Sequence, residues 1–104
     1  MGKPGPETRL VAAMRKAGKE KYGERLVTIK YHGSPYSEAG VSDLLNCLDG
    51  VFIAVEAKAG TGHKVTMKQQ AFLDRVEAAG GIAAVCWSVE QFMAVLAAAE
   101  ARIG

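Results

Sequence analysis

Apolar and polar residues recur with two different periods along the chain, and each period indicates a type of secondary structure. Near the start, Leu10 and Met14 recur at the spacing of one helical face. Pro6 precedes them, and proline is favoured in the first turn of a helix. The pattern predicts a helix that begins near Pro6 and ends at Gly18 or Gly23.

A two-residue period follows this helix and predicts a strand over Arg25–His32. Its apolar residues Val27, Ile29 and Tyr31 share one face, because side chains alternate along a strand. Gly, Pro and Ser then dominate residues 33–40, which predicts a polar loop.

The stretch Val41–Ala59 predicts a β-hairpin, because apolar residues flank Asp49 and Gly50 on both sides. Asp-Gly is typical of a two-residue type I′ turn, in which both residues need a positive φ. With this turn, the register places Asp43 directly opposite Glu56, with Cβ atoms about 5 Å apart. A shift of one residue would move Asp43 to the other face, so the prediction depends on the turn.

Two helices and one strand complete the chain. The strand is predicted over Ile82–Trp87, a nearly continuous apolar run of the kind that is buried on both faces of a sheet. The helix before it closes at Gly80-Gly81. Capping boxes predict where the two helices begin: Thr66 with Gln69, and Ser88 with Gln91.

The predicted order of elements is therefore α-β-β-β-α-β-α, an α/β (α+β) fold with a mixed four-stranded sheet flanked by helices. The helix between the third and fourth strands makes a crossover if these strands are parallel. The 104 residues suit one domain. Residues 1–5 are rich in Gly and Pro and are expected to be flexible.

Composition excludes several classes of protein. A net charge of +2 permits a nucleic-acid partner without arguing for one. Cys47 and Cys86 lack zinc-site spacing, and buried free thiols fit a reducing cytosol. No leader or membrane-spanning run is visible, so we expect a cytoplasmic protein. The loop GTGHK lacks the phosphate-loop pattern, which argues against a nucleotide cofactor.

Candidate chemistry lies at the open end of the predicted hairpin. Lys58 shares the face of Glu56, so Asp43, Glu56 and Lys58 converge there. Two opposed carboxylates repel each other unless a cation lies between them, and a divalent metal is the obvious candidate. The alternative is a surface hairpin that carries a few solvated charges. Glu56 argues against it, because this residue ends the most apolar strand, where an unpaired charge is costly.

The motif D-x(12)-E-A-K resembles that of the PD-(D/E)XK nucleases, although Ser42 stands where the superfamily name has Pro. Four segments in this order are similar to the VRR-NUC family, the virus-type replication-repair nucleases: GVSDLL (40–45), GVFIAVEAK (50–58), QQAFL (69–73) and AGG (79–81). The resemblance covers roughly residues 7–89. It implies a restriction-endonuclease-like core and the stand-alone form of the domain.

The resemblance also implies hydrolysis of phosphodiester bonds with Mg²⁺ or Mn²⁺. Asp43, Glu56 and the backbone carbonyl of Ala57 would bind the metal, and oxygen ligands suit these cations. Lys58 would orient or deprotonate the attacking water, or stabilise the phosphorus centre. Glu7 resembles a first-helix glutamate that completes the site through a second metal or a water. Its alternative role is that of a carboxylate in the first helical turn, where the helix dipole favours an anion.

A glutamine after the E-x-K strand faces the site in the family, and Gln70 resembles it. The alternative for Gln70 is a solvated helix position, and Gln69 is better explained by its capping box. Residues near the second helix and the first loop are candidate DNA contacts, with ordinary solvated surface as their alternative: Lys64, Lys68, His63, Thr66, Lys30 and Tyr36.

The hypothesis that follows is a metal-dependent, structure-selective DNA endonuclease that cuts branched DNA such as Holliday junctions or flaps. Its setting would be a bacterial or phage-infected host cell. A homodimer would supply the two sites that paired cuts need, and the Ala-rich third helix could pack closely against a second copy. One alternative is a non-catalytic nucleic-acid-binding module on the same fold. Another is a sequence-specific restriction-type nuclease, for which the chain leaves little room to read bases.

Overall fold

The computed structural model describes residues 4–61 and 64–103. Its elements in chain order are α1 (Pro6–Tyr22), the 3-10 helix η1 (Gly23–Arg25), β1 (Leu26–Lys30), β2 (Leu44–Leu48), β3 (Val51–Ala57), α2 (Met67–Ala78), β4 (Ile82–Cys86) and α3 (Val89–Ile103). This order confirms the predicted α-β-β-β-α-β-α arrangement. Three of the five N-terminal residues that we expect to be flexible lie outside the described residues. None of the helices in the described ranges is long and apolar enough to span a bilayer.

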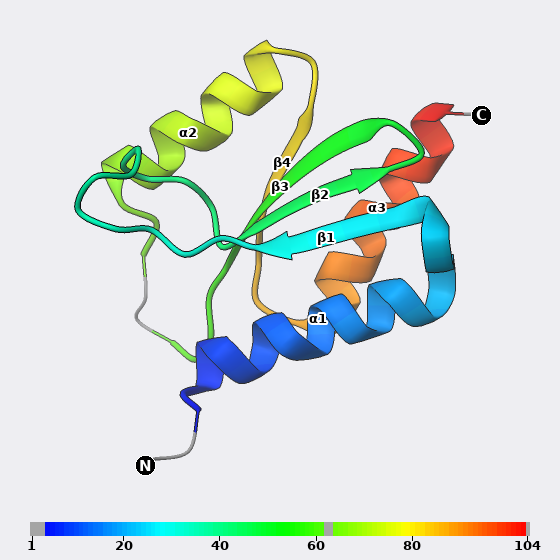
Figure 1. The fold of residues 1–104 in the computed structure, drawn as a ribbon, viewed down its shortest axis with the longest axis horizontal. Coiled ribbons are helices and arrows are strands. Elements are labelled where there is room, and N and C mark those ends of the chain that lie inside the picture. Colours follow the sequence, from blue (N-terminus) through cyan, green and yellow to red (C-terminus); the bar gives the residue numbers. More distant parts are fainter. Residues whose placement is uncertain (1–3, 62–63, 104) are drawn as a thin grey trace.

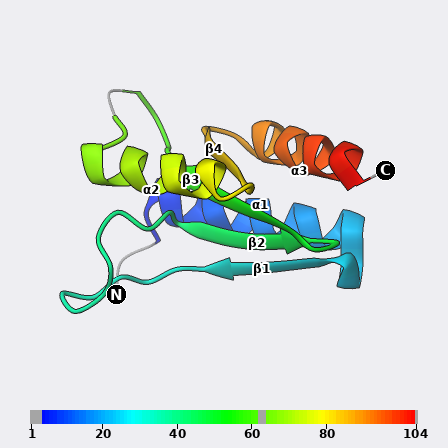
Figure 2. The ribbon, with the colours of Figure 1, turned by 90° about the horizontal axis from the view of Figure 1, so that it is seen from above.

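The four strands form one mixed sheet in the order β1-β2-β3-β4 (Figure 2). β1 and β2 are antiparallel, as are β2 and β3, whereas β3 and β4 are parallel. α2 connects the two parallel strands and so makes the predicted crossover. The mixed sheet expected from the sequence is therefore confirmed.

The turn between β2 and β3 has the predicted geometry. Asp49 has a φ of 48° and Gly50 a φ of 89°, so both residues adopt the positive values that a type I′ turn requires. The guanidinium of Arg25 contacts the carboxylates of Asp49 and Glu100, and thereby ties the turn to η1 and α3. The register that the turn was expected to set is confirmed along the whole of β2.

Helices cover the sheet on both faces. α1 and α3 pack on one face over the main core, in which Met14, Leu44, Phe92 and Leu96 are fully buried. α2 packs on the other face against a smaller cluster around Ala54. Figure 1 shows the strands between α2 and the other two helices. Because side chains alternate along β3, every second residue counted from Ala54 points to the side of α2.

Gly18 and Gly23 are the two predicted ends of the first helix, and the structure excludes Gly18, which lies inside α1. A Cβ at Gly18 would lie 2.7 Å from Cδ2 of Leu26 and 3.3 Å from Cε2 of Phe92. The glycine therefore lets α1 pack closely against β1 and α3. The helix ends instead at Gly23, where φ is 58°, a value that favours glycine.

The prediction that the fourth strand is buried on both faces is wrong for most of its length. Only Cys86 is buried in β4, and the four residues before it are half-buried. β4 lies at the edge of the sheet and pairs with β3 alone. An apolar run does not distinguish a central strand from an edge strand that helices cover.

The two predicted capping boxes differ in the structure. At α2 the box is complete, with side-chain and backbone groups of Thr66 and Gln69 bonded in both directions. At α3 only one half forms, because Oγ of Ser88 accepts from the Gln91 N–H at 3.1 Å. Oε1 of Gln91 accepts instead from the N–H of Trp87 at 2.6 Å. The glutamine thus satisfies a donor one residue earlier than predicted.

Part of the sheet face on the side of α2 is left uncovered. Val27 and Ile29 on β1 are 55% and 53% exposed, and Phe52 on β3 is 42% exposed. Cys47 lies in the same row of the sheet as Val27 and Phe52 and is only half-buried. The expectation of two buried thiols therefore holds for Cys86 alone, whose burial raises the pKa of its thiol to about 11.

Candidate active site

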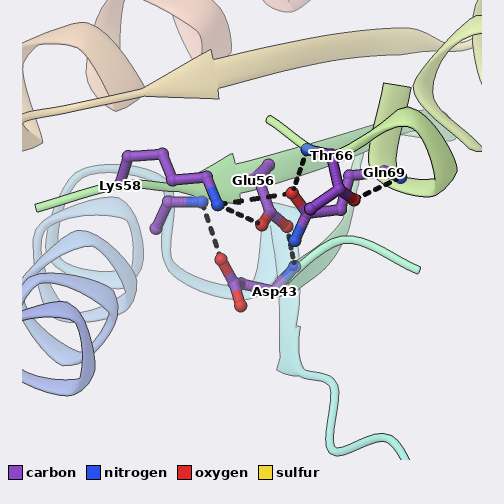
Figure 3. A network of polar contacts seen from close by, with 6 residues as sticks. Asp43, Glu56, Lys58, Thr66 and Gln69 are labelled. Carbon is purple, nitrogen blue, oxygen red and sulfur yellow. Dashed lines mark hydrogen bonds and ion pairs between the residues drawn. The ribbon is translucent and has the colours of Figure 1, made fainter. Parts of the chain in front are cut away.

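Asp43 and Glu56 face each other where β2 begins and β3 ends (Figure 3). The register continues from the pair Leu44 and Val55 to place them opposite each other. Oδ2 of Asp43 accepts a hydrogen bond from the N–H of Ala57 at 2.8 Å. Oε1 of Glu56 accepts one from the N–H of Asp43 at 3.2 Å. Each carboxylate therefore binds the backbone of the opposite strand.

Lys58 points to the same side as Glu56, two residues further along the chain. Its Nζ lies 3.4 Å from Oε2 of Glu56. The same Nζ donates to Oε1 of Gln69 at 3.3 Å. Lys58 is 8% exposed and Glu56 is 2% exposed, so the ion pair lies largely out of solvent. Buried ammonium and carboxylate groups are retained in proteins when they are paired in this way.

The charge of the site is unbalanced. Burial and, to a smaller extent, the nearby carboxylate of Asp43 raise the pKa of Glu56 to about 7, while the Lys58 ammonium opposes both effects. Two carboxylates face a single ammonium, which leaves a surplus of negative charge when both are ionised. A bound cation would remove this surplus and would favour the ionised form of Glu56.

The donor set fits a hard divalent cation. Carboxylate and carbonyl oxygens are the ligands that Mg²⁺ and Mn²⁺ prefer. The backbone of Ala57 faces the side of Asp43, because its N–H binds that carboxylate and the N–H and C=O of a strand residue face the same neighbour. Within residues 4–61 and 64–103 no three Asp, Glu, His or Cys side chains form a metal cluster. Asp43 and Glu56 would therefore need the Ala57 carbonyl, water or substrate oxygens to complete a coordination shell.

The structure brings Gln69 to the site, whereas the sequence pointed to Gln70. Oε1 of Gln69 accepts from the Thr66 N–H at 2.9 Å, as the capping box requires, and also from Lys58. Gln70 is exposed, and its side chain donates to Oδ1 of Asp74 at 2.8 Å on the surface of α2. The first residue of a T-x-x-Q box signals the helix start, but nothing in the sequence indicates that the glutamine also reaches the lysine.

Glu7 lies in the first turn of α1 and is half-buried. In the described part of the chain, it does not form a group of three acidic side chains with Asp43 and Glu56. No hydrogen bond or ion pair between Glu7 and these two residues is found among the described residues. Its position agrees with that of a first-turn carboxylate, which the helix dipole favours.

The predicted DNA contacts lie around the loops near the site. Lys64, Thr66 and Lys68 are exposed at the start of α2. Lys30 is half-buried at the end of β1, and Tyr36 is 98% exposed in the loop after it. His63 lies outside the described residues.

The loop before Asp43 is packed tightly onto α2. Gly40 has a φ of 80°, and a Cβ at this position would overlap the backbone carbonyl of Lys68. The side chain of Arg75 on α2 donates to Oε1 of Glu38 in the same loop at 3.1 Å. The loop and the first turn of α2 therefore meet as backbone against backbone, next to the strand that carries Asp43.

Solved structures resemble this chain, whereas no family model and no curated protein matches it. A structure described as "VRR_NUC domain" has a TM-score of 0.64 and 25% identity, over 89% of this chain and 96% of that one. A second, "VRR_NUC domain protein", has a TM-score of 0.65 and 16% identity, over 90% of this chain and 87% of that one. The resemblance noted in the sequence is thus confirmed at the level of structure. Over about 90% of its length, the chain has the fold of VRR_NUC domain proteins, a nuclease family.

Proposed function

We propose that this protein is a divalent-metal-dependent endonuclease that hydrolyses phosphodiester bonds in branched DNA. One observation carries the proposal. Glu56 is almost fully buried, yet it lies between the carboxylate of Asp43 and the ammonium of Lys58 at the end of the sheet. A buried, charge-rich group without a ligand costs stability, and such groups concentrate at functional sites.

In this proposal Asp43, Glu56 and the carbonyl of Ala57 hold Mg²⁺ or Mn²⁺. The metal, when bound, supplies a water of lowered pKa and neutralises charge that develops on the phosphate. Lys58 is held by two acceptors, Glu56 and Gln69, and its third N–H remains available to a phosphate oxygen or to the attacking water. Positioning an ammonium in this way favours the transition state because no reorganisation is needed during the reaction.

Selection by DNA shape is supported over selection by base sequence. Residues 31–43 form the longest irregular segment within the described ranges. Such a short, single loop offers few side chains for the hydrogen bonds to base edges that sequence reading needs. The fully exposed ring of Tyr36 in this loop can stack on an unpaired base, which is a contact that tolerates any sequence.

A homodimer is part of the proposal, because two cuts in a symmetric junction need two related sites. The uncovered sheet face around Val27, Ile29 and Phe52 supports a second copy as the partner, since exposed apolar patches mark interaction sites. Ile29→Glu should convert a dimer to a monomer in light scattering and leave the fold intact. A wild-type protein that is monomeric at the concentrations used for cleavage would remove the dimer from the proposal.

The direct test is cleavage of labelled junction, flap, duplex and single-stranded DNA with Mg²⁺ or Mn²⁺. Wild type should cut branched DNA best, and chelator should stop the reaction. Glu56→Gln and Lys58→Met should each reduce the rate by at least about 100-fold, as removal of a transition-state contact does. Cutting that survives both substitutions contradicts the proposal. DNA binding that is indifferent to metal, with no cleavage, would instead identify a non-catalytic binding module.

A further inference from the structure

A second charged feature lies along the outer edge of the sheet, away from the carboxylates. Nη2 of Arg15 donates to the carbonyl of Thr28 at 3.2 Å. Nζ of Lys19, one helical turn further along α1, donates to the carbonyl of Leu26 at 2.7 Å and to that of Gly23 at 2.9 Å. The carbonyls on the free edge of β1 are therefore bound by cations of α1.

In the described part of the chain, no carboxylate offsets the charge of these cations, because the groups that they bind are neutral carbonyls. Among the described residues, neither Arg15 nor Lys19 forms an ion pair with a carboxylate. Lys16 lies beside them and is 79% exposed, with Glu20 at 4.0 Å as its ion-pair partner, a distance at which an exposed pair contributes little. Together with Val27 and Thr28 these three cations line a hollow of about 330 Å³, the basic hollow.

The surplus charge of the protein is concentrated on this helix. α1 carries five Lys and Arg residues and two Glu residues, a surplus of +3, whereas the whole chain has a net charge of +2. The mild overall charge thus conceals one strongly positive element. Clustered cations on one face form the electrostatic footprint of nucleic-acid binding.

The basic hollow lies within a short distance of the carboxylates along β1. α1 runs alongside β1 and in the opposite direction (Figure 1). β1 leads to Tyr31, whose N–H donates to the carbonyl of Asp43 at 2.8 Å. Thr28 precedes Tyr31 by three residues, which corresponds to about 10 Å along an extended strand. A nucleic-acid strand whose phosphate lies at Asp43 can therefore extend past the basic hollow within a few nucleotides.

We propose that the basic hollow is a non-catalytic site for backbone phosphates of the DNA arm beside the cut. The inference rests on the proposed function and specifies which surface of the protein holds the substrate. Arg15 and Lys19 are held in place by the strand edge, so little side-chain entropy is lost when a phosphate binds. Lys16 adds an exposed charge. The contacts are independent of sequence, as phosphate contacts are.

The test is the salt dependence of binding to a labelled four-way junction, measured by fluorescence anisotropy in EDTA. Each phosphate contact contributes about 0.9 to the slope of log K against log salt concentration. Arg15→Gln/Lys16→Gln/Lys19→Gln should reduce the slope by about 2 to 3 and weaken binding at least tenfold at low salt. Lys21→Gln, on the same helix but outside the basic hollow, is the matched control and should leave the slope within about 0.3 of wild type.

The single variant Lys16→Gln keeps the test valid if the triple variant does not fold. Lys16 donates no hydrogen bond to the strand edge, so its replacement should leave the fold intact. It should reduce the slope by about 0.9. Slopes equal to wild type in the single and triple variants overturn the inference, and so does an equal loss in Lys21→Gln. Wild-type cleavage accompanied by unchanged slopes would refute this inference alone. A wild type that neither binds nor cuts DNA would refute the proposed function together with it.

Discussion

Lowering the pH should stabilise the metal-free protein through a single buried carboxyl group. The pKa of Glu56 is raised by burial and by Asp43, from its ordinary value of 4.5 to about 7. Between these two pH values the folded protein therefore binds a proton at Glu56 that the unfolded chain has released. By linkage, the free energy of unfolding falls as the pH rises through this interval. The contribution is fully present below pH 4.5 and is lost above pH 7.

The size of the effect follows from the two pKa values. One unit of pKa difference corresponds to about 1.4 kcal/mol, so a shift from 4.5 to about 7 gives at most roughly 3 to 4 kcal/mol. Most of this decrease in the free energy of unfolding should occur between pH 5 and pH 7. This is a substantial fraction of the total stability of a small domain, which is about 5 to 15 kcal/mol.

The assay is urea denaturation in EDTA at a series of pH values for wild type and for Glu56→Gln. Glutamine at position 56 does not titrate and keeps an oxygen that can accept the Asp43 N–H. All other groups are common to the two proteins, so the difference between their unfolding free energies isolates Glu56. The unfolding free energy of wild type minus that of Glu56→Gln should fall by about 2 to 3 kcal/mol from pH 5 to pH 8.

Parallel pH profiles of the two proteins would refute the reasoning. They would mean that Glu56 titrates at the same pH in the folded and unfolded states, which its burial and its contact with Asp43 do not allow. A difference that rises with pH would show instead that Lys58 outweighs both effects and holds the pKa of Glu56 below its ordinary value.

Three further predictions test separate parts of the site. Mn²⁺ should raise the melting temperature of wild type, more at pH 8 than at pH 5 because ligands bind deprotonated, and Asp43→Asn should abolish this shift in thermal melting. Gln69→Ala should lower the cleavage rate at saturating substrate and cost about 1 kcal/mol of stability through its lost cap. Gln70→Ala should change the cleavage rate by less than about twofold and the stability by less than about 0.5 kcal/mol. Equal effects of the two variants would contradict the role of Gln69 at Lys58. Gly40→Ala should cost about 1 to 3 kcal/mol in urea denaturation, because it strains a positive φ and pushes the loop off α2; an unchanged midpoint would show that the loop is not held there.

Short-range signals in the sequence were sufficient for most of the fold. The Asp49-Gly50 turn fixes a register, and a register carries every pair along the strands, so Asp43 and Glu56 could be placed together without a structure. The T-x-x-Q box likewise marks the start of α2, because both of its hydrogen bonds are local. Such signals depend only on neighbouring residues.

Features that depend on residues distant in the chain could not be predicted from the sequence. Gly18 reads as a helix end until Leu26 and Phe92 are seen to occupy the space that a Cβ would need. The apolar run of β4 predicts a strand buried on both faces, although its position at the edge is decided by the order of the strands. The contact between Gln69 and Lys58 depends on how α2 is placed over the sheet. None of these follows from local propensity or period.

The reciprocal hydrogen bonds of Asp43 and Glu56 have a consequence for the preparation of inactive protein. These two side chains accept hydrogen bonds from backbone N–H groups in place of the backbone ladder, at the point where β2 begins after the loop. An alanine at either position would therefore open the end of the hairpin as well as remove a carboxylate, and its loss of activity would report both changes at once. Asparagine at 43 and glutamine at 56 retain an acceptor for the same backbone N–H groups. The amide variants are thus the ones in which a lost reaction can be ascribed to lost charge.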